Sequence, residues 1–264
     1  MPEGHTVHRT ANDFNRLFAG KAVSIDSPQG RFTADAKLIS GRELIKASAV
    51  GKQLFLEFDN ELFLRIHLGI YGKWQWHLVD YLPEVVGEVR ARFFCGSALA
   101  ELRGPTVCEV IDNHAMQQVL RRLGPDPLNP DKSEKERSRF VSKVRASKKS
   151  IGELLMDQSV IAGIGNVYRA EILFRAEIEP HTPGNSLPVE TLNDLWVDAV
   201  KLLKVGVKTS FMITRDELFT KRPSKAERNW VYKREGQPCR KCGKKIKIEL
   251  MAGRKLYWCA TCQR

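Results

Sequence analysis

The sequence predicts an α+β protein of several domains, in which an antiparallel β-sandwich with a leading helix precedes a helical region and a small cysteine-bearing unit. Between Ala22 and about Val110 the apolar residues form short runs separated by turn residues, a pattern typical of antiparallel strands. After the proline-rich segment 124–130 the apolar spacing becomes helical. Two Cys-x-x-Cys pairs follow within the last thirty residues. At 264 residues the chain has room for two domains and an appendage.

The leading helix is predicted over residues 3–18. Its apolar side chains recur three or four positions apart, at Val7, Ala11, Phe14 and Phe18. Gly20 stands just past this segment, where helices commonly end. One face of the helix is therefore expected to pack against the sandwich.

Two β-hairpins are predicted within the sandwich, each made of two apolar runs around a short turn: 53–58 with 61–66, and 89–94 with 98–102. Asp59-Asn60 forms the first turn and Cys95-Gly96-Ser97 forms the second. Neighbouring strands joined in this way are antiparallel, which is the basis for predicting a sandwich.

The segment 124–130 contains three prolines, which exclude a regular helix or a central strand and mark an interdomain linker. Beyond it, helices are predicted at 134–147, 150–158, 166–176 and 192–206, and a loop at 212–234. We therefore expect a sandwich domain at 2–120, a linker at 121–133, a helical domain at 134–225 and a cysteine unit at 226–264.

The charge of the chain points to a polyanionic partner. Lys and Arg outnumber Asp and Glu by 43 to 31, which gives a net charge of +12. Between Lys221 and Arg264 fourteen residues are basic and three are acidic, so this segment alone carries +11. Such an excess favours nucleic acid, although a merely basic surface is the alternative. No apolar run approaches the ~18 residues of a membrane span, and no secretory pattern opens the chain, so a cytoplasmic location is expected.

The last unit is predicted to hold one structural Zn²⁺ through Cys239, Cys242, Cys259 and Cys262. The two pairs are sixteen residues apart, a spacing that brings four thiolates to one tetrahedral ion and leaves no open catalytic position. A unit this small needs the metal in order to fold. Two disulfides or a redox pair are the alternative, which a cytosolic setting disfavours. Cys95 and Cys108 are expected to be small buried residues.

The zinc unit is also rich in cations: Lys241, Lys244, Lys245, Lys247, Arg254 and Lys255. The segments 245–250 and 255–258 can pair as a short hairpin. A metal-held hairpin with this charge suits phosphate binding, whereas a solvated basic surface without a ligand is the alternative.

Four motifs resemble one protein family when they are taken together. The chain opens Met1-Pro2-Glu3-Gly4, carries Gly51-Lys52 at the head of a strand, has Leu-Met-Asp-Gln at 155–158 before Ala-Gly-Ile-Gly-Asn-Val-Tyr at 162–168, and ends with Gly253-Arg254 ahead of Tyr-Trp-Cys at 257–259. The set resembles the formamidopyrimidine-DNA glycosylase/endonuclease VIII family of bacterial DNA glycosylase/AP lyases, over essentially the whole chain. The opening and the Gly-Lys pair are more similar to the endonuclease VIII branch, especially to its actinobacterial members.

The resemblance implies that the amine of Pro2 is the nucleophile. An α-amine has a pKa of about 7.7–8.0, compared with about 10.4 for lysine, and a position at a helix N-terminus lowers it further. The amine would attack the deoxyribose C1′, and departure of the base would leave an iminium that permits elimination of the flanking phosphates. This role requires the removal of Met1, and an ordinary start with Met1 retained is the alternative.

The resemblance also implies catalytic roles for Glu3 and Lys52. Glu3 would donate the proton that opens the sugar or assists base departure. From the sequence alone it is a favourable carboxylate at a helix start, which stays ionised, so the acid role requires burial or a bound phosphate. Lys52 would contact the phosphate of the lesion and assist proton transfer, whereas an exposed strand-edge lysine is the alternative.

The family's helix–two-turns–helix element is expected around Asn166, which opens a helix after Gly163-Ile164-Gly165. A glycine-rich turn feeding a helix presents backbone N–H groups to a phosphate, although a simple N-cap is the other interpretation. The resemblance places Arg254 at the tip of the zinc hairpin, where it would grip a phosphate. Asn166 and Arg254 would bracket the kinked DNA backbone at the lesion.

An extruded base leaves a gap that a wedge must fill, and the resemblance places this wedge at Ile70 and Tyr71. Packing of these two side chains in the core is the alternative, and His67 before them is taken as structural. Two positions depart from the familiar pattern. Gly69 stands where the branch has a glutamine that reads the opposite base, and Thr6 stands where a carboxylate contacts the opened sugar.

We therefore predict a bifunctional DNA glycosylase/AP lyase that excises oxidised pyrimidines through a Schiff base at Pro2, followed by β/δ-elimination. The same chemistry on oxidised purines is the alternative, because base choice depends on loops such as 212–234. A non-catalytic, zinc-dependent DNA-binding protein is a third possibility. The expected partner is damaged or abasic double-stranded DNA, bound by a monomer associated with the nucleoid.

Overall fold

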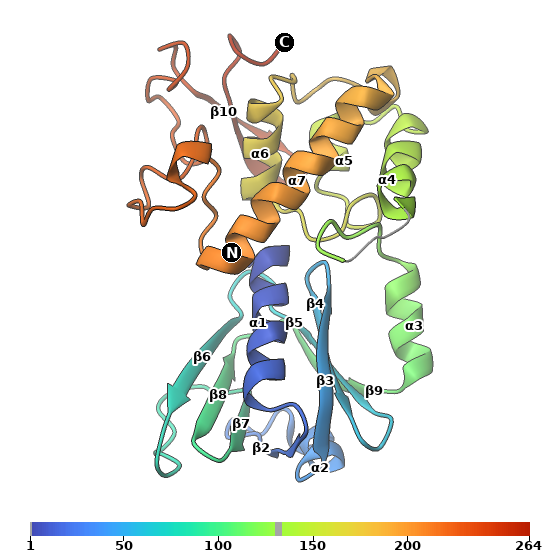
Figure 1. Cartoon of the computed structure of the whole chain (residues 1–264), viewed down its shortest axis with the longest axis vertical. Helices are drawn as coiled ribbons and strands as arrows, with labels where there is room; N and C mark the ends of the chain where they lie inside the picture. The colour runs from blue at the N-terminus through green and yellow to red at the C-terminus, as the bar shows by residue number, and fades with distance from the viewer. Residues whose placement is uncertain (1, 130–133) are drawn as a thin grey trace. The chain divides into compact units, whose positions relative to one another are not determined.

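The computed structural model describes residues 2–129 and 134–264, which divide into two compact units, one ending at Arg122 and the other beginning at Leu123 (Figure 1). Met1, whose removal is required of the predicted nucleophile, and Pro130 with the rest of the predicted linker to 133 lie outside the described residues. No described helix is both long and apolar enough to span a membrane.

The N-terminal unit is a sandwich of two antiparallel sheets with a helix leading into it, as predicted. One sheet has the order β1-β3-β4-β5-β9 and the other β2-β7-β8-β6. In chain order the elements are α1 (Gly4–Leu17), β1 (Lys21–Ala22), β2 (Ser24–Asp26), α2 (Thr33–Ile39), β3 (Glu43–Val50), β4 (Gln53–Phe58), β5 (Phe63–His67), β6 (Lys73–Leu78), β7 (Ala91–Cys95), β8 (Ala98–Arg103), β9 (Val107–Ile111) and α3 (Asn113–Arg121).

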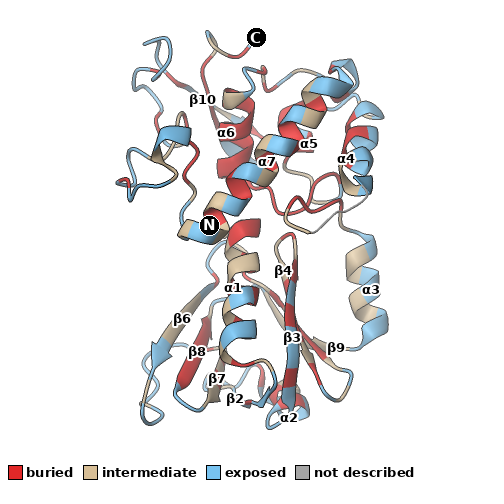
Figure 2. Cartoon of the chain, in the orientation of Figure 1, coloured by how far each residue is buried: buried red, intermediate tan, exposed pale blue. Residues whose placement is uncertain are grey.

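Helix α1 is amphipathic and packs against strands β3 and β4. The apolar positions Val7, Ala11 and Phe14, together with Phe18 just past the helix, are buried, and the exposed positions of the helix are all polar (Figure 2). The ring of Phe14 meets Trp74, Trp76 and Phe93 from the second sheet, with centroids 5.0, 5.1 and 5.5 Å away. The helix therefore belongs to the core of the sandwich, which sets the position of the residues that precede it.

Both predicted hairpins form, with shifted ends. Strand β5 begins at Phe63 and not at Glu61, because Glu61 adopts a left-handed conformation (φ 63°) inside the turn. Helices α2 and α3 lie in segments where no helix was predicted. Helix α3 is capped by Asp112, whose side chain accepts a hydrogen bond from the amide of Ala115 at 2.7 Å, and none of the helix residues is buried.

The second unit is helical and ends in a two-stranded hairpin. Its elements are α4 (Lys135–Arg145), α5 (Ile151–Leu154), α6 (Asn166–Arg175), η1 (Gly184–Ser186), α7 (Val189–Thr209), η2 (Asp216–Leu218), β10 (Lys247–Met251) and β11 (Arg254–Trp258). The predicted loop at 212–234 contains only the short 3-10 helix η2. Helices α4 and α6 lie close to their predicted ranges, and α7 is longer at both ends than predicted.

The helix predicted over 150–158 is wrong in length, since α5 stops after four residues. Ser150 and Glu153 form a capping box that starts the helix. The side chain of Gln158 then folds the chain into a turn, because it donates to the carbonyl of Ile164 at 2.9 Å and accepts from the amide of Gly163 at 3.0 Å. Helix α6 can therefore begin at Asn166 directly after this turn.

The described part of the proline-rich segment packs against the helical unit. The amide of Gly124 donates to the carbonyl of Gln158 at 2.8 Å, and the amide of Ala162 donates to the carbonyl of Pro125 at 2.8 Å. Asp126 is buried and caps the turn that follows through the amide of Leu128 at 2.9 Å. The segment is therefore an ordered part of the second unit at least as far as residue 129.

Candidate active site and zinc centre

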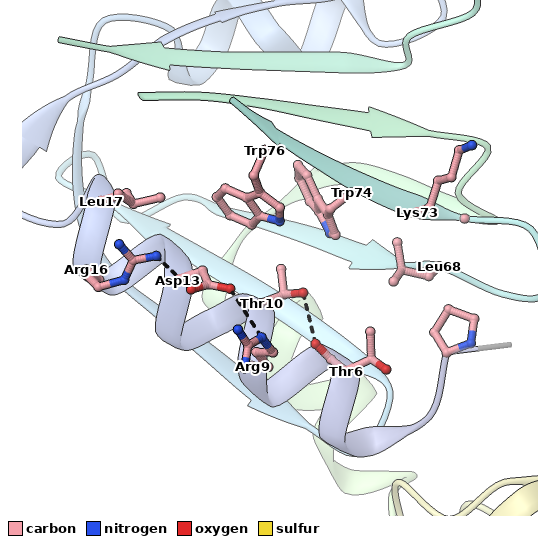
Figure 3. A pocket seen from close by; sticks show the side chains of 12 residues that line it. Thr6, Arg9, Thr10, Asp13, Arg16, Leu17, Leu68, Lys73, Trp74 and Trp76 are labelled. Carbon is pink, nitrogen blue, oxygen red and sulfur yellow. Dashed lines mark hydrogen bonds and ion pairs between the residues drawn. The ribbon is translucent and has the colours of Figure 1, made fainter. Parts of the chain in front are cut away.

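A groove of about 460 Å³ runs between helix α1 and strand β6, and Pro2 lies among its lining residues. Side chains from successive turns of α1 form one wall, and Trp74 and Trp76 of β6 form the other (Figure 3). Leu68 and Gly72 from the loop between β5 and β6 also line the groove. Pro2 therefore lies at a groove that has an aromatic wall.

Glu3 follows Pro2 and is completely buried. It occupies the N-cap position of α1 in an extended conformation (φ −124°), and its side chain makes no capping hydrogen bond. The simple role of a helix-capping carboxylate is therefore not realised. Burial is the environment that the predicted acid role requires.

Lys52 lies with Gly51 in the two-residue turn between β3 and β4, and not at the head of a strand as predicted, since Val50 pairs with Gln53. The ring nitrogen Nδ1 of His67 is 3.0 Å from the carbonyl oxygen of Lys52. Leu68, the next residue, lines the groove together with Pro2. His67, taken as structural from the sequence, thus ties Lys52 to the strand that leads into the groove.

The loop 68–72 is tight and turns its two central side chains outward. Gly72 donates its amide to the carbonyl of Leu68 at 2.9 Å, and a Cβ on Gly72 would lie 2.2 Å from that same oxygen. Ile70 is 45% exposed and Tyr71 is 85% exposed. Packing of these two residues in the core is therefore excluded.

Gly69, at the position where the resemblance expects a glutamine, has a backbone conformation and surroundings that favour glycine. Its φ is +63°, and a Cβ at this position would lie 1.9 Å from the side-chain oxygen of Thr106. Any larger residue here would require Thr106 to move and the backbone to adopt a strained conformation. A glutamine at this position would therefore be strained and would displace the Thr106 side chain.

His5, in the first turn of α1, is a buried histidine that predicts an acid-sensitive N-terminal unit. Burial lowers its pKa to about 4 from the usual 6.5. The unfolded chain therefore takes up this proton near pH 6.5, whereas the folded chain takes it up only near pH 4, so stability falls as the pH falls through this window. The expected loss of unfolding free energy is up to about 3 kcal/mol.

Urea unfolding at several values between pH 7 and pH 4, followed by tryptophan fluorescence, measures this effect against a His5→Gln variant. Acidification should lower the unfolding free energy of the wild type more than that of the variant. A difference that stays constant with pH would show that His5 does not titrate as described.

In the second unit, the structure brings the start of α6 and the tip of the zinc hairpin together. The side-chain amide of Asn166 donates to the carbonyl of Lys255 at 2.8 Å and accepts from the Arg169 guanidinium at 2.5 Å. The same guanidinium donates to the carbonyl of Met251 at 3.1 Å. Two backbone groups that flank Arg254 are thereby held by the first turn of α6.

Arg254 begins strand β11 directly after the turn Ala252-Gly253, at the tip of the hairpin as predicted, and its side chain is exposed. Lys247 and Lys255 on the same hairpin are also exposed. Asn166 and Arg254 therefore lie on adjoining segments of the second unit, Asn166 buried and Arg254 exposed.

The four predicted cysteines converge at the end of this hairpin. Their sulfur atoms all lie within 4.8 Å of one another, with 3.8 Å between Cys239 and Cys262 and 3.5 Å between Cys242 and Cys259. Zn–S bonds of about 2.3 Å in a tetrahedron place sulfurs about 3.8 Å apart, so the set fits Zn²⁺. The distances exclude disulfides, whose sulfurs are about 2.05 Å apart. Cys95 and Cys108 are half-buried free thiols.

Sequence reasoning missed three residues that support these sites. His5 and Arg169 are buried polar residues that contact Thr6 and Asn166, respectively. Glu171 is completely buried and accepts hydrogen bonds from the amides of Trp230, Val231 and Tyr232 at 2.7–2.9 Å, and from the Thr214 hydroxyl. It therefore fixes both ends of the loop that follows α7. A charged residue inside an apolar helical stretch was the available signal for Arg169 and Glu171.

Comparison with known proteins covers all three parts of the chain. Residues 1–104 match the formamidopyrimidine-DNA glycosylase N-terminal domain, and residues 123–217 match the formamidopyrimidine-DNA glycosylase H2TH domain. Residues 236–264 match the zinc finger found in FPG and IleRS. Four sulfurs at zinc-binding distances agree with this last match, so the chain carries one structural zinc.

The relatives match over their whole length. The protein "Endonuclease 8 1" of Mycobacterium tuberculosis is 44% identical over 100% of both chains, and a formamidopyrimidine-DNA glycosylase of Heliobacterium modesticaldum is 31% identical over 100% of this chain and 99% of the relative. The crystal structure of MutM (Fpg) from Thermus thermophilus is similar with a TM-score of 0.78 at 26% identity, covering 99% of this chain and 98% of that one. A Lactococcus lactis Fpg in complex with DNA containing an abasic site has the same fold, with a TM-score of 0.81 at 23% identity over 99% of both chains.

These domains and relatives define a DNA glycosylase of base excision repair that also has AP lyase activity. The chain belongs to the formamidopyrimidine-DNA glycosylase/endonuclease VIII family. The alternative of a non-catalytic DNA-binding protein is therefore not retained.

Proposed function

We propose that this enzyme excises oxidised pyrimidines through a Schiff base on the amine of Pro2, once Met1 has been removed. The observation that carries the mechanism is the position of Pro2 on the groove, followed at once by the buried Glu3. The preference for pyrimidines rests on the greater identity to the mycobacterial endonuclease 8 relative, 44%, than to the formamidopyrimidine-DNA glycosylase of Heliobacterium, 31%.

The chemistry assigns one step to each residue. The Pro2 nitrogen bonds to C1′ of the deoxyribose as the bond from C1′ to the base breaks, and the proton that the amine loses passes to the departing base. Glu3 then gives a proton to the ring oxygen O4′, the C1′–O4′ bond breaks, and the opened sugar is left as an iminium on the Pro2 nitrogen. Lys52 contributes a positive charge near the phosphate of the lesion. The resulting iminium acidifies the C2′ proton, so β-elimination and then δ-elimination release the flanking phosphates.

Contacts with the DNA backbone are assigned to Asn166 and Arg254. The N-terminus of α6, which begins at Asn166, and the exposed guanidinium of Arg254 are suited to phosphate oxygens, and the Asn166 side chain holds the carbonyl of Lys255 next to Arg254. Ile70 and Tyr71 are proposed to fill the gap left by the extruded base, which their exposure supports. The double-stranded DNA is bound by a monomer in this proposal.

Borohydride trapping tests the proposal. Duplexes that carry thymine glycol, 8-oxoguanine or an abasic site are incubated with the protein and reduced. The expected result is a covalent adduct that maps to the N-terminal peptide and forms faster with thymine glycol than with 8-oxoguanine. Faster trapping with 8-oxoguanine would assign the enzyme to oxidised purines, and an adduct elsewhere in the chain would overturn the assignment of Pro2.

A further inference from the structure

The end of strand β6 and the loop that leads from it toward β7, residues 78–88, carry a group of exposed apolar side chains. Leu78, Tyr81 and Val86 are 79, 79 and 78% exposed. Soluble proteins rarely expose apolar side chains in such groups unless the group binds another molecule. We call residues 78–88 the β6–β7 surface. Leu78 is the last residue of β6, so this surface lies at the opposite end of the strand from loop 68–72 (Figure 1).

The backbone of the β6–β7 surface is held by two arginines from the sheet. The guanidinium of Arg92 on β7 donates to the carbonyl of Pro83 at 3.0 Å, and that of Arg103 on β8 donates to the carbonyl of Val86 at 2.8 Å. Each guanidinium also pairs with a carboxylate on a strand of the same sheet. The loop is therefore fixed to the sheet through its backbone, while its apolar side chains face the solvent. A preformed surface of this kind costs little ordering when a partner binds.

The charge of the β6–β7 surface is opposite to the net charge of the chain. Its charged residues are three exposed carboxylates, those of Asp80, Glu84 and Glu88, so it carries −3 in a protein of net +12. No Lys or Arg occurs between Lys73 and Arg90. Among the residues that the structure describes, none forms an ion pair with any of the three carboxylates. Such a surface repels DNA phosphates and attracts the side chains of Lys and Arg.

A groove of about 570 Å³ adjoins this surface, within the ~300–1,000 Å³ that is usual for ligand sites. Glu84 lines it, as do two cations. Arg103 is one of these cations and is already paired with Glu101 at 2.6 Å, and the other, Lys73, lies at the far end of β6. Apolar residues of the loop and of β8 line the groove as well: Val79, Pro83, Val86 and Leu99. The groove can therefore accept an apolar side chain next to the acidic residues of the surface.

We propose that the β6–β7 surface docks a partner protein, through a segment in which apolar side chains are flanked by Lys or Arg. An apolar side chain of that segment occupies the groove beside Val86, Tyr81 packs against its neighbours, and the basic side chains pair with the three carboxylates. Tyrosine is among the residues that most often dominate the energy of an interface. Because the surface repels DNA and lies away from loop 68–72, the enzyme can hold this partner and DNA at the same time.

A random-peptide display library tests the chemistry of the partner. The library is selected on the full-length, zinc-loaded enzyme and counter-selected on a Tyr81→Ser/Val86→Ser double variant, whose thermal unfolding should be unchanged because both side chains are exposed. Counter-selection removes acidic peptides that bind the basic surfaces common to both proteins. The expected result is enrichment of peptides that combine apolar residues with Lys or Arg. Enrichment of peptides without basic residues, or no enrichment over the double variant, would overturn the proposal.

Fluorescence anisotropy with the most enriched peptide then separates the apolar and the charged contributions. Tyr81→Ser should weaken binding by about tenfold or more. Asp80→Asn/Glu84→Gln should weaken it by about three- to tenfold and make it less dependent on salt. Leu38→Ser, which removes an exposed apolar side chain from α2, is the matched control and should stay within about twofold of wild type. Cleavage of abasic DNA should be unchanged in all of these variants. Equal binding by Tyr81→Ser and wild type would overturn the proposal, and so would dimerisation of the enzyme in sedimentation velocity that Tyr81→Ser abolishes, because the surface would then belong to a second copy of the chain.

Discussion

A Pro2→Leu variant is expected to lose the borohydride adduct with abasic DNA by at least on the order of 100-fold. Methionine is removed before small residues and retained before leucine, so this change both replaces the secondary amine and moves the chain's α-amine one residue away. Displacement of a reacting group by about 1 Å can cost on the order of 100-fold in rate, and this displacement is larger. Trapping followed by peptide mapping of the adduct measures the loss.

Two further variants make this result specific. Pro2→Gly leaves an α-amine in the same place, so it should retain part of the trapping that Pro2→Leu loses. Lys52→Ala should still form its adduct at the N-terminal peptide, only more slowly, because Lys52 is assigned to phosphate and proton contacts. If Pro2→Leu traps normally while Lys52→Ala does not, the lysine is the nucleophile and the assignment of Pro2 is wrong.

The fold class was predictable from the sequence because the relevant patterns are local. Short apolar runs bounded by turn residues, helical spacing and the two Cys-x-x-Cys pairs each lie within a short stretch of sequence, and each specifies its own element. The start of the helix predicted over 150–158 is also correct, since Ser150 is the N-cap of α5. The end of that helix was not predictable, since it depends on where the Gln158 side chain finds partners in the following turn.

The candidate site was only partly predictable, because it depends on contacts between segments that are distant in sequence. Asn166 and Arg254 are recognisable as motif residues, but the contacts that join them run through the buried Arg169, 85 residues before Arg254 in sequence. The constraint on Gly69 comes from Thr106 on a different part of the sandwich. Contacts between segments distant in sequence leave no periodic signal, so they appear only in the folded chain.

Removal of zinc is expected to abolish DNA binding while the N-terminal unit stays folded. The finger's own core is small and shares Cys239 and Cys259 with the metal site, whereas the sandwich has a separate core. Structural zinc contributes about 10–16 kcal/mol of folding free energy in small fingers, far more than so small a core can replace. Loss of the finger releases β10 and β11 and with them the position of Arg254. Chelation followed by fluorescence anisotropy with an abasic duplex, and by near-ultraviolet circular dichroism, measures both outcomes.

The Arg254→Ala variant separates the role of this side chain from that of the fold. The zinc ligands and the contacts made by Asn166 and Arg169 to neighbouring carbonyls are retained in this variant. Affinity should therefore fall about tenfold, and the slope of log Kd against log salt should decrease by about one. Lys204→Ala, which removes an exposed cation from α7, is the matched control and should leave both values near wild type. Equal effects of the two substitutions would mean that the basic charge of the unit, and not the tip of the hairpin, provides the affinity. A larger effect of Arg254→Ala would identify Arg254 as a defined phosphate contact. The zinc-bound hairpin would then serve to hold this side chain in position.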